Sequence, residues 1–241
     1  MDIALIIESI QTLLGGVVLT LELTILSLLI GFVLSVPLAF MRASRSPWLS
    51  WPVLAYTYVF RGTPLLVQLF LIYYGLGQLA FVRESFLWLL FRDPFYCALL
   101  AFSLNSAAYT IEVFRGGIQS VPPGLVEAAQ AIGLSPTKIS LRIVFPLAFR
   151  TVLPSYANEV VGMIKASSLA STVTLLEITG LARKLVSETF APYEVFIAAG
   201  AIYLGLTFLA SRLFNLIELH LSGAPPDKAR RPWLLKLRQA L

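Results

Sequence analysis

The chain has 241 residues, of which 58% are hydrophobic and only 13% are charged, against about 45–50% and about 25% in an average soluble domain. A soluble fold of this length cannot hide so much apolar surface behind a polar exterior, so composition excludes an ordinary soluble enzyme and also a disordered chain. The net charge of +5 does not indicate a nucleic-acid partner, because the basic residues lie mostly between hydrophobic runs.

Charge-free runs mark the expected membrane spans of a polytopic, all-α protein. No Lys or Arg precedes Arg42, so the N-terminus lacks the positive region of a secretory signal and is interpreted as a retained first span. Each span is expected to be one continuous helix, because lipid cannot satisfy the polar groups of the backbone. The sequence predicts a single transmembrane domain with five spans, near residues 14–40, 54–80, 94–112, 151–175 and 194–217.

The basic residues between the spans are distributed asymmetrically. Alternate segments, starting with the loop after the first span, hold twelve Lys and Arg residues, and the other set holds four. Cytoplasmic segments are enriched in Lys and Arg, so the N-terminus is expected outside and the C-terminus in the cytoplasm. Trp48, Trp51 and Trp88 lie near span ends, as interface anchors do. The basic tail at 218–241 either lies on anionic lipid or is a frayed end.

The segment between spans 3 and 4, residues 113–150, is too long for a simple connection and has strong helix punctuation. Pro123 suits the first turn of a helix and Gly133 suits a C-terminal cap, so a short helix is predicted at about 125–132. The pair Ser135-Pro136 begins another helix. This punctuation is consistent with a solvated hairpin and equally with a short helix presented for docking.

The residues of this segment resemble the EAA motif of ABC importer permeases, EAA-x3-G-x9-I-x-L-P. Glu127-Ala128-Ala129 is followed by Gly133 and then by Ile143-Val144-Phe145-Pro146, with Phe145 at a position where Leu is usual. Other stretches look like the subgroup for polar amino acids, which includes histidine, glutamine, arginine and opine permeases. These stretches are Phe60–Gln68, Ser103–Tyr109, Arg115–Ile118 and Lys165–Ser171.

The resemblance implies a mechanism and a set of partners. The short helix, with Glu127, Ala128, Ala129 and Gly133 as coupling residues, would dock on a cytoplasmic ATPase that drives the permease pair between inward- and outward-facing states. A second permease subunit, identical or homologous, an external solute-binding protein and the lipids of a bacterial inner membrane would complete the assembly. The chain has no G-x-x-x-x-G-K-[ST] phosphate loop, so ATP and Mg are expected on the ATPase, with no cofactor and no metal in this chain.

Polar residues within the spans are the candidates for the translocation path. A charge at the bilayer centre costs roughly 2.5–3.5 kcal/mol, so Arg61, Glu159 and Lys165 are expected to face a cavity or a partner. A zwitterionic substrate also needs polar contacts in a low-dielectric site. Five residues offer them: Gly62, Thr63, Asn105, Ser106 and Tyr109. The alternatives are interhelical ion pairs, snorkelling of Lys165, and hydrogen bonds between helices.

The sequence therefore predicts the permease subunit of an ATP-driven ABC importer that carries a polar amino acid or an opine. A membrane-embedded enzyme is disfavoured, because the sequence contains no catalytic constellation. The other alternative is an ion-coupled secondary transporter of small polar solutes. It is disfavoured by the odd number of spans and by the lack of an inverted internal repeat.

Overall fold

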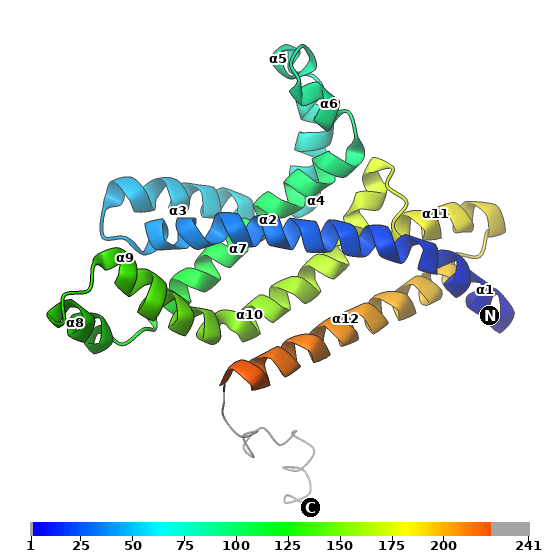
Figure 1. Ribbon diagram of the computed structural model, residues 1–241. Helices are drawn as coiled ribbons and strands as arrows, with labels where there is room; N and C mark the ends of the chain where they lie inside the picture. Colours follow the sequence, from blue (N-terminus) through cyan, green and yellow to red (C-terminus); the bar gives the residue numbers. More distant parts are fainter. Residues whose placement is uncertain (1, 223–241) are drawn as a thin grey trace, which may run out of the picture.

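The computed structural model describes residues 2–222, and every regular element within that range is a helix (Figure 1). The expected all-α membrane fold is confirmed, but the expected count of five spans is not. Within the described residues, three helices are long and apolar enough to cross a membrane, and a fourth span is gained if a helix pair bent by 50° counts as one. They are Ile3–Ala43, Pro94–Gln119, Pro192–Leu221 and the pair Pro136–Val173 with Ile178–Thr189.

The first membrane helix is longer than the predicted span at 14–40. α1 (Ile3–Leu13), a 3-10 turn and α2 (Val17–Ala43) form one uninterrupted helical stretch. Its start is set by Asp2, whose carboxylate accepts hydrogen bonds from two backbone N–H groups of the first turn at 2.9 and 3.3 Å, as an N-cap residue does. Leu13 is fully buried against the last two helices of the fold, which holds the extension in place.

The predicted span at 54–80 is two helices, so the expectation of one continuous helix is wrong here. α3 (Pro47–Gly62) ends, the chain becomes extended, and α4 (Leu65–Phe70) begins and continues into a π-helical turn, Leu71–Gly75. Pro64 explains the break, because it lacks an N–H group and disfavours the helical conformation of the residue before it. Neither half reaches the roughly 20 residues that a span needs.

The third span begins where the sequence predicts. α5 (Ala80–Arg83) and α6 (Leu87–Phe91) are short helices that project from the body of the fold together with α4 (Figure 1). α7 (Pro94–Gln119) then starts with Pro94 in its first turn and with Asp93 as N-cap, whose carboxylate accepts from a backbone N–H at 2.9 Å. It extends seven residues beyond the predicted end at 112 and includes the charged residue Arg115.

The long connection after α7 is largely helical. α8 (Pro123–Ala131) and α9 (Pro136–Ile139) are separate, but α9 passes through a π-helical turn, Ser140–Val144, directly into α10 (Phe145–Ala166). The helix that contains the start of the fourth predicted span, 151–175, therefore begins at Pro136, well before residue 151. Figure 1 shows α8 and α9 at one end of α2, and α1 at the other.

The last part of the chain contains a helix that the sequence does not predict. α10 ends in a 3-10 stretch, Ser167–Val173, and is followed by α11 (Ile178–Thr189) and by α12 (Pro192–Ser222). α12 covers the predicted span at 194–217. Residues 223–241, which make up most of the predicted basic tail, lie outside the described residues.

A buried carboxylate fixes the start of α11. Glu177 is fully buried and accepts hydrogen bonds from the N–H groups of Thr179 and Gly180 at 2.8 and 2.9 Å. The hydroxyl of Tyr203, on α12, donates to the same carboxylate at 2.8 Å. A carboxylate at a helix N-terminus is favoured by the helix dipole, so Glu177 stabilises the bend between α10 and α11.

α7 lies at the centre of the fold, with two-thirds of its most apolar stretch buried, against about one-sixth in α12. Small residues allow this packing. A Cβ atom added to Gly31 of α2 would lie 3.2 Å from the backbone oxygen of Ser103 and from the nitrogen of Ala107. On the other side of α7, a Cβ at Gly117 would lie 3.1 Å from the Ala148 carbonyl oxygen. The polar side chains of α7 are thus held between α2, α3 and α10.

Candidate coupling helix and translocation path

The short helix predicted after the third span is present as α8, and its ends have the predicted chemistry. Pro123 occupies the first turn, and Gly133 has a φ of +77°, a conformation that favours glycine. The Gly133 N–H donates to the Gln130 carbonyl at 2.9 Å, and the Leu134 N–H donates to the Ala129 carbonyl at 3.1 Å. This pair of bonds is the Schellman motif, so Gly133 ends α8 through its backbone conformation.

The four predicted coupling residues do not all face outward. Glu127 and Ala128 are exposed, whereas Ala129 is buried against the loop cluster that contains Val121, Ile139 and Val144. Ala129 therefore attaches α8 to the fold, and Gly133 sets where α8 ends.

Two apolar residues on the exposed face of α8 were not among the predicted coupling residues. Leu125 and Ile132 are exposed apolar side chains, with Ile132 77% accessible. With Ala128 between them they follow helical i, i+3, i+7 spacing, which places all three on one face. That spacing is visible in the sequence and could have identified this apolar ridge.

The break between α3 and α4 places three predicted path residues, Arg61, Gly62 and Thr63, next to two others, Asn105 and Tyr109, on α7. The Arg61 guanidinium carbon lies 5.3 Å from the centre of the Tyr109 ring, a cation–π contact. Asn105 donates from its side-chain amide to the Phe60 carbonyl at 3.3 Å. The Thr63 hydroxyl donates to a carbonyl of the preceding turn at 2.8 Å. Gly62 is exposed in the same segment, with no atom within 4 Å of where a Cβ would stand.

Glu159 reaches α7 from the other side, on α10. Its carboxyl group lies next to the hydroxyl of Ser106, although Ser106 Oγ makes no hydrogen bond of good geometry among the described residues. Ser106 and Tyr109 are three positions apart and therefore neighbours on the surface of α7. Lys165 is exposed on α10, and the structure does not bring it to this group.

Two polar groups near the path were not predicted as site residues. Gln68 accepts a hydrogen bond from Asn105 at 3.0 Å. Glu112 forms ion pairs with Arg42 at 3.2 Å and with Arg115 at 2.7 Å, which links α2 to α7. The sequence signal was Glu112 itself, since it ends the charge-free run of the third span, but its partner Arg42 is 70 positions away.

No group of three or more His, Cys, Asp or Glu side chains is arranged to hold a metal ion among residues 2–222. The described residues form an apolar helical bundle with one broken span and with a capped, exposed helix at one end, an arrangement typical of a membrane transport subunit. The chain belongs to the family of binding-protein-dependent transport system inner membrane components, whose model matches residues 27–223.

The chain is similar to permeases of known transport systems. It is 56% identical over 231 residues to the nopaline transport system permease protein NocM of Agrobacterium fabrum, covering 95% of both chains. It is 52% identical to the octopine permease OccM of Rhizobium meliloti, covering 93% of this chain and 91% of that protein. It is 42% identical to the histidine/lysine/arginine/ornithine permease HisM of Escherichia coli K12, covering 84% and 86%.

Solved structures agree with this family. A structure described as an amino acid ABC transporter with histidines is 33% identical, with a TM-score of 0.79, and the match covers 91% of this chain and 99% of that one. An inward-facing MetNI methionine ABC transporter is 18% identical, with a TM-score of 0.75 over 88% and 96% of the two chains, which shows a shared fold. The predicted subgroup and the inner-membrane location are confirmed. The chain is a channel subunit, and ATP hydrolysis is carried by separate subunits.

Proposed function

We propose that this chain and a second permease subunit, identical or homologous, form the channel through which an ATP-driven importer moves an opine across the bacterial inner membrane. The observation that carries the proposal is the pair of opposite charges, Arg61 on α3 and Glu159 on α10, which lie beside Tyr109 and Ser106, about one turn apart on α7. An opine carries both carboxylate and cationic groups, so each charge has a counterpart in the substrate. The similarity to nopaline and octopine permeases favours opines over single amino acids.

The proposed path contains the residues gathered at the α3–α4 break and their neighbours on α7 and α10. Lys165 is included in the proposed path because it is an exposed cation on the same helix as Glu159. A break in a span is a usual place for a binding site, because irregular backbone at membrane depth is tolerated where it is buried in protein or lines a cavity. The path residues are Arg61, Gly62, Thr63, Asn105, Ser106, Tyr109, Glu159 and Lys165.

In the proposed assembly, partner proteins bind ATP and deliver the substrate. The exposed face of α8 would contact the ATPase, which would hold ATP and Mg, with no cofactor in this chain. An external solute-binding protein would deliver the substrate.

This function is tested by reconstitution in liposomes with and without the partners. We expect uptake of octopine or nopaline only when ATP, the ATPase and the solute-binding protein are present, and at least tenfold less when any one is omitted. Uptake by this chain alone, driven by an ion gradient, would favour the secondary transporter instead. Omission of ATP alone is the matched control, since all proteins remain in place.

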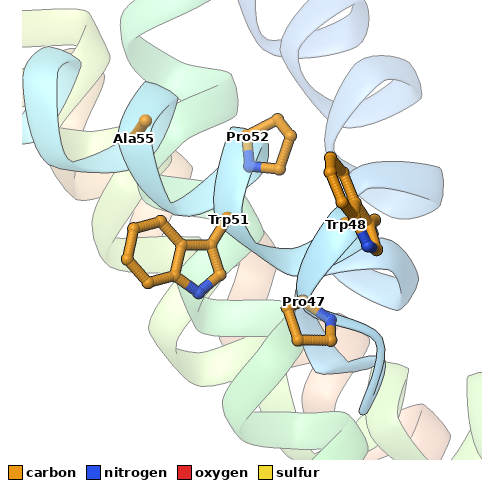
Figure 2. A pocket seen from close by; sticks show the side chains of 5 residues that line it. All are labelled: Pro47, Trp48, Trp51, Pro52 and Ala55. Carbon is orange, nitrogen blue, oxygen red and sulfur yellow. The ribbon is translucent and has the colours of Figure 1, made fainter.

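We also propose five spans with the N-terminus outside, counting α3 with α4 and its π-helical turn as one broken span. Two features support it. α8 and α11 lie at opposite ends of the molecule (Figure 1), as loops on opposite sides of a membrane would. Trp48 and Trp51, 90% and 71% exposed, point outward from the first turns of α3 beside Pro47, Pro52 and Ala55 (Figure 2), and tryptophan favours the membrane interface.

Cysteine labelling tests this orientation. In a Cys97→Ala background, Ser187→Cys on α11 is expected to react with a membrane-impermeant maleimide in intact spheroplasts. Thr137→Cys on α9 is expected to react only after permeabilisation. Both positions are exposed, whereas the native Cys97 is buried, so the difference reports the side of the membrane. Labelling of both sites in intact spheroplasts would contradict the proposed topology.

A further inference from the structure

We infer that Gln68 is a positioning residue of the translocation path, whose side-chain amide holds the break between α3 and α4 so that Arg61 faces the substrate in a fixed geometry. The inference rests on the proposed path and adds a residue that does not itself contact the substrate.

The break creates carbonyl groups that the helix cannot satisfy. In an α-helix the carbonyl of residue i accepts from the N–H of residue i+4, and for Phe60 that residue is Pro64, which has no N–H. The Thr63 carbonyl loses its helical donor in a different way, since the Val67 N–H donates to the Pro64 carbonyl at 3.0 Å. At membrane depth such carbonyls must find partners inside the protein.

Gln68 supplies these partners. Its Nε2 lies 2.8 Å from the Phe60 carbonyl oxygen, 3.1 Å from the Thr63 carbonyl oxygen and 2.8 Å from the Thr63 hydroxyl. Its Oε1 accepts from Asn105 Nδ2 at 3.0 Å. The side chain is 7% exposed. Because a primary amide has two N–H hydrogens, both are already shared among three acceptors, and neither is left for a substrate.

The network fixes both members of the cation–π contact. Arg61 directly follows Phe60, whose carbonyl oxygen accepts hydrogen bonds from the side-chain amides of Gln68 and Asn105. These bonds hold the backbone next to the residue that carries the guanidinium. Asn105 stands one turn before Tyr109 on α7. Arg61 and Tyr109 are both exposed, so the guanidinium remains open to the path while its support is buried.

Gln68→Met tests this role, because methionine keeps the length of the side chain and removes the amide. In the reconstituted complex with its ATPase and solute-binding protein, we expect the apparent affinity for octopine to fall about tenfold. ATP hydrolysis without substrate should stay within about twofold of wild type, which separates positioning from loss of fold. Gln78→Met is the matched control, since Gln78 is exposed in the turn after the π-helical segment, and it should behave as wild type.

Unchanged affinity in Gln68→Met would overturn the inference. If Gln68→Met does not assemble, Pro64→Ala is added, because alanine restores an N–H for the Phe60 carbonyl. Renewed assembly with weakened affinity supports the inference, whereas renewed assembly with wild-type affinity, or failure of both variants to assemble, overturns it. Absence of ATP-driven uptake in the wild-type complex would instead remove the proposed function, and this inference with it.

Discussion

A Gly133→Pro variant is expected to insert and assemble but to lose at least tenfold in ATP-driven uptake. Gly133 has a φ of +77°, and proline is restricted to about −65°. Proline also removes the N–H that bonds to the Gln130 carbonyl at 2.9 Å, and the changed turn disrupts the bond from Leu134 to Ala129. The end of α8 would shift, and the exposed ridge at Ile132 with it, so closure of the ATPase would no longer move the permease.

The measurement is substrate uptake together with ATP hydrolysis in the reconstituted complex. Size-exclusion chromatography reports whether the complex assembles. Gly133→Asn is the matched control, because asparagine adds a side chain yet tolerates positive φ, and it should retain most of the uptake. Normal uptake by Gly133→Pro would contradict the docking role of α8. An equal loss in Gly133→Asn would show that the added side chain matters, and not the backbone conformation.

A Glu159→Gln variant is expected to weaken the apparent affinity for a cationic substrate roughly 10- to 100-fold. The substitution keeps the size of the side chain beside Ser106 and removes its charge. Hydrogen bonds to charged groups contribute about 1.5–3 kcal/mol, and each 1.4 kcal/mol corresponds to a factor of ten. Uptake against substrate concentration measures the effect.

Glu188→Gln provides the comparison for this variant, since Glu188 is an exposed carboxylate on α11, away from the proposed path. It should transport as wild type does. Equal affinity in Glu159→Gln and wild type would remove Glu159 from the path and leave it a role in packing between α10 and α7.

Local chemistry in the sequence predicted both ends of α8, whereas most span ends drawn from charge-free runs differ from the observed helix ends. Pro123 begins this helix and Gly133 ends it, because fixed φ, a missing N–H and tolerance of positive φ act within a single turn. The break at Pro64 lies inside an uncharged run, so the pattern of charged and apolar residues did not indicate it. The proline was visible, but the groups that satisfy a broken helix come from Gln68 and from Asn105, 37 positions further on. That partnership exists only in the folded chain.

The site was predicted in part for the same reason. Residue type and membrane depth identified Arg61 and Glu159 as candidates, since charges in spans are costly. Which residue of α7 each one meets depends on how α3 and α10 pack around it. α11 was missed because Arg183 and Lys184 look like loop charges, although they stand on the exposed side of a helix whose other side is buried.

The continuity of the segment Pro136–Val173 has a mechanical consequence. The segment includes a π-helical turn, Ser140–Val144, and its contour is roughly 55 Å long at 1.5 Å per residue, with α8 next to one end and Glu159 about two-thirds of the way along. We expect a displacement of α8 to be passed along this helical segment to the proposed substrate contact at Glu159. Energy from ATP would then reach the path through one helical segment, which the short turn at residues 132–135 joins to α8.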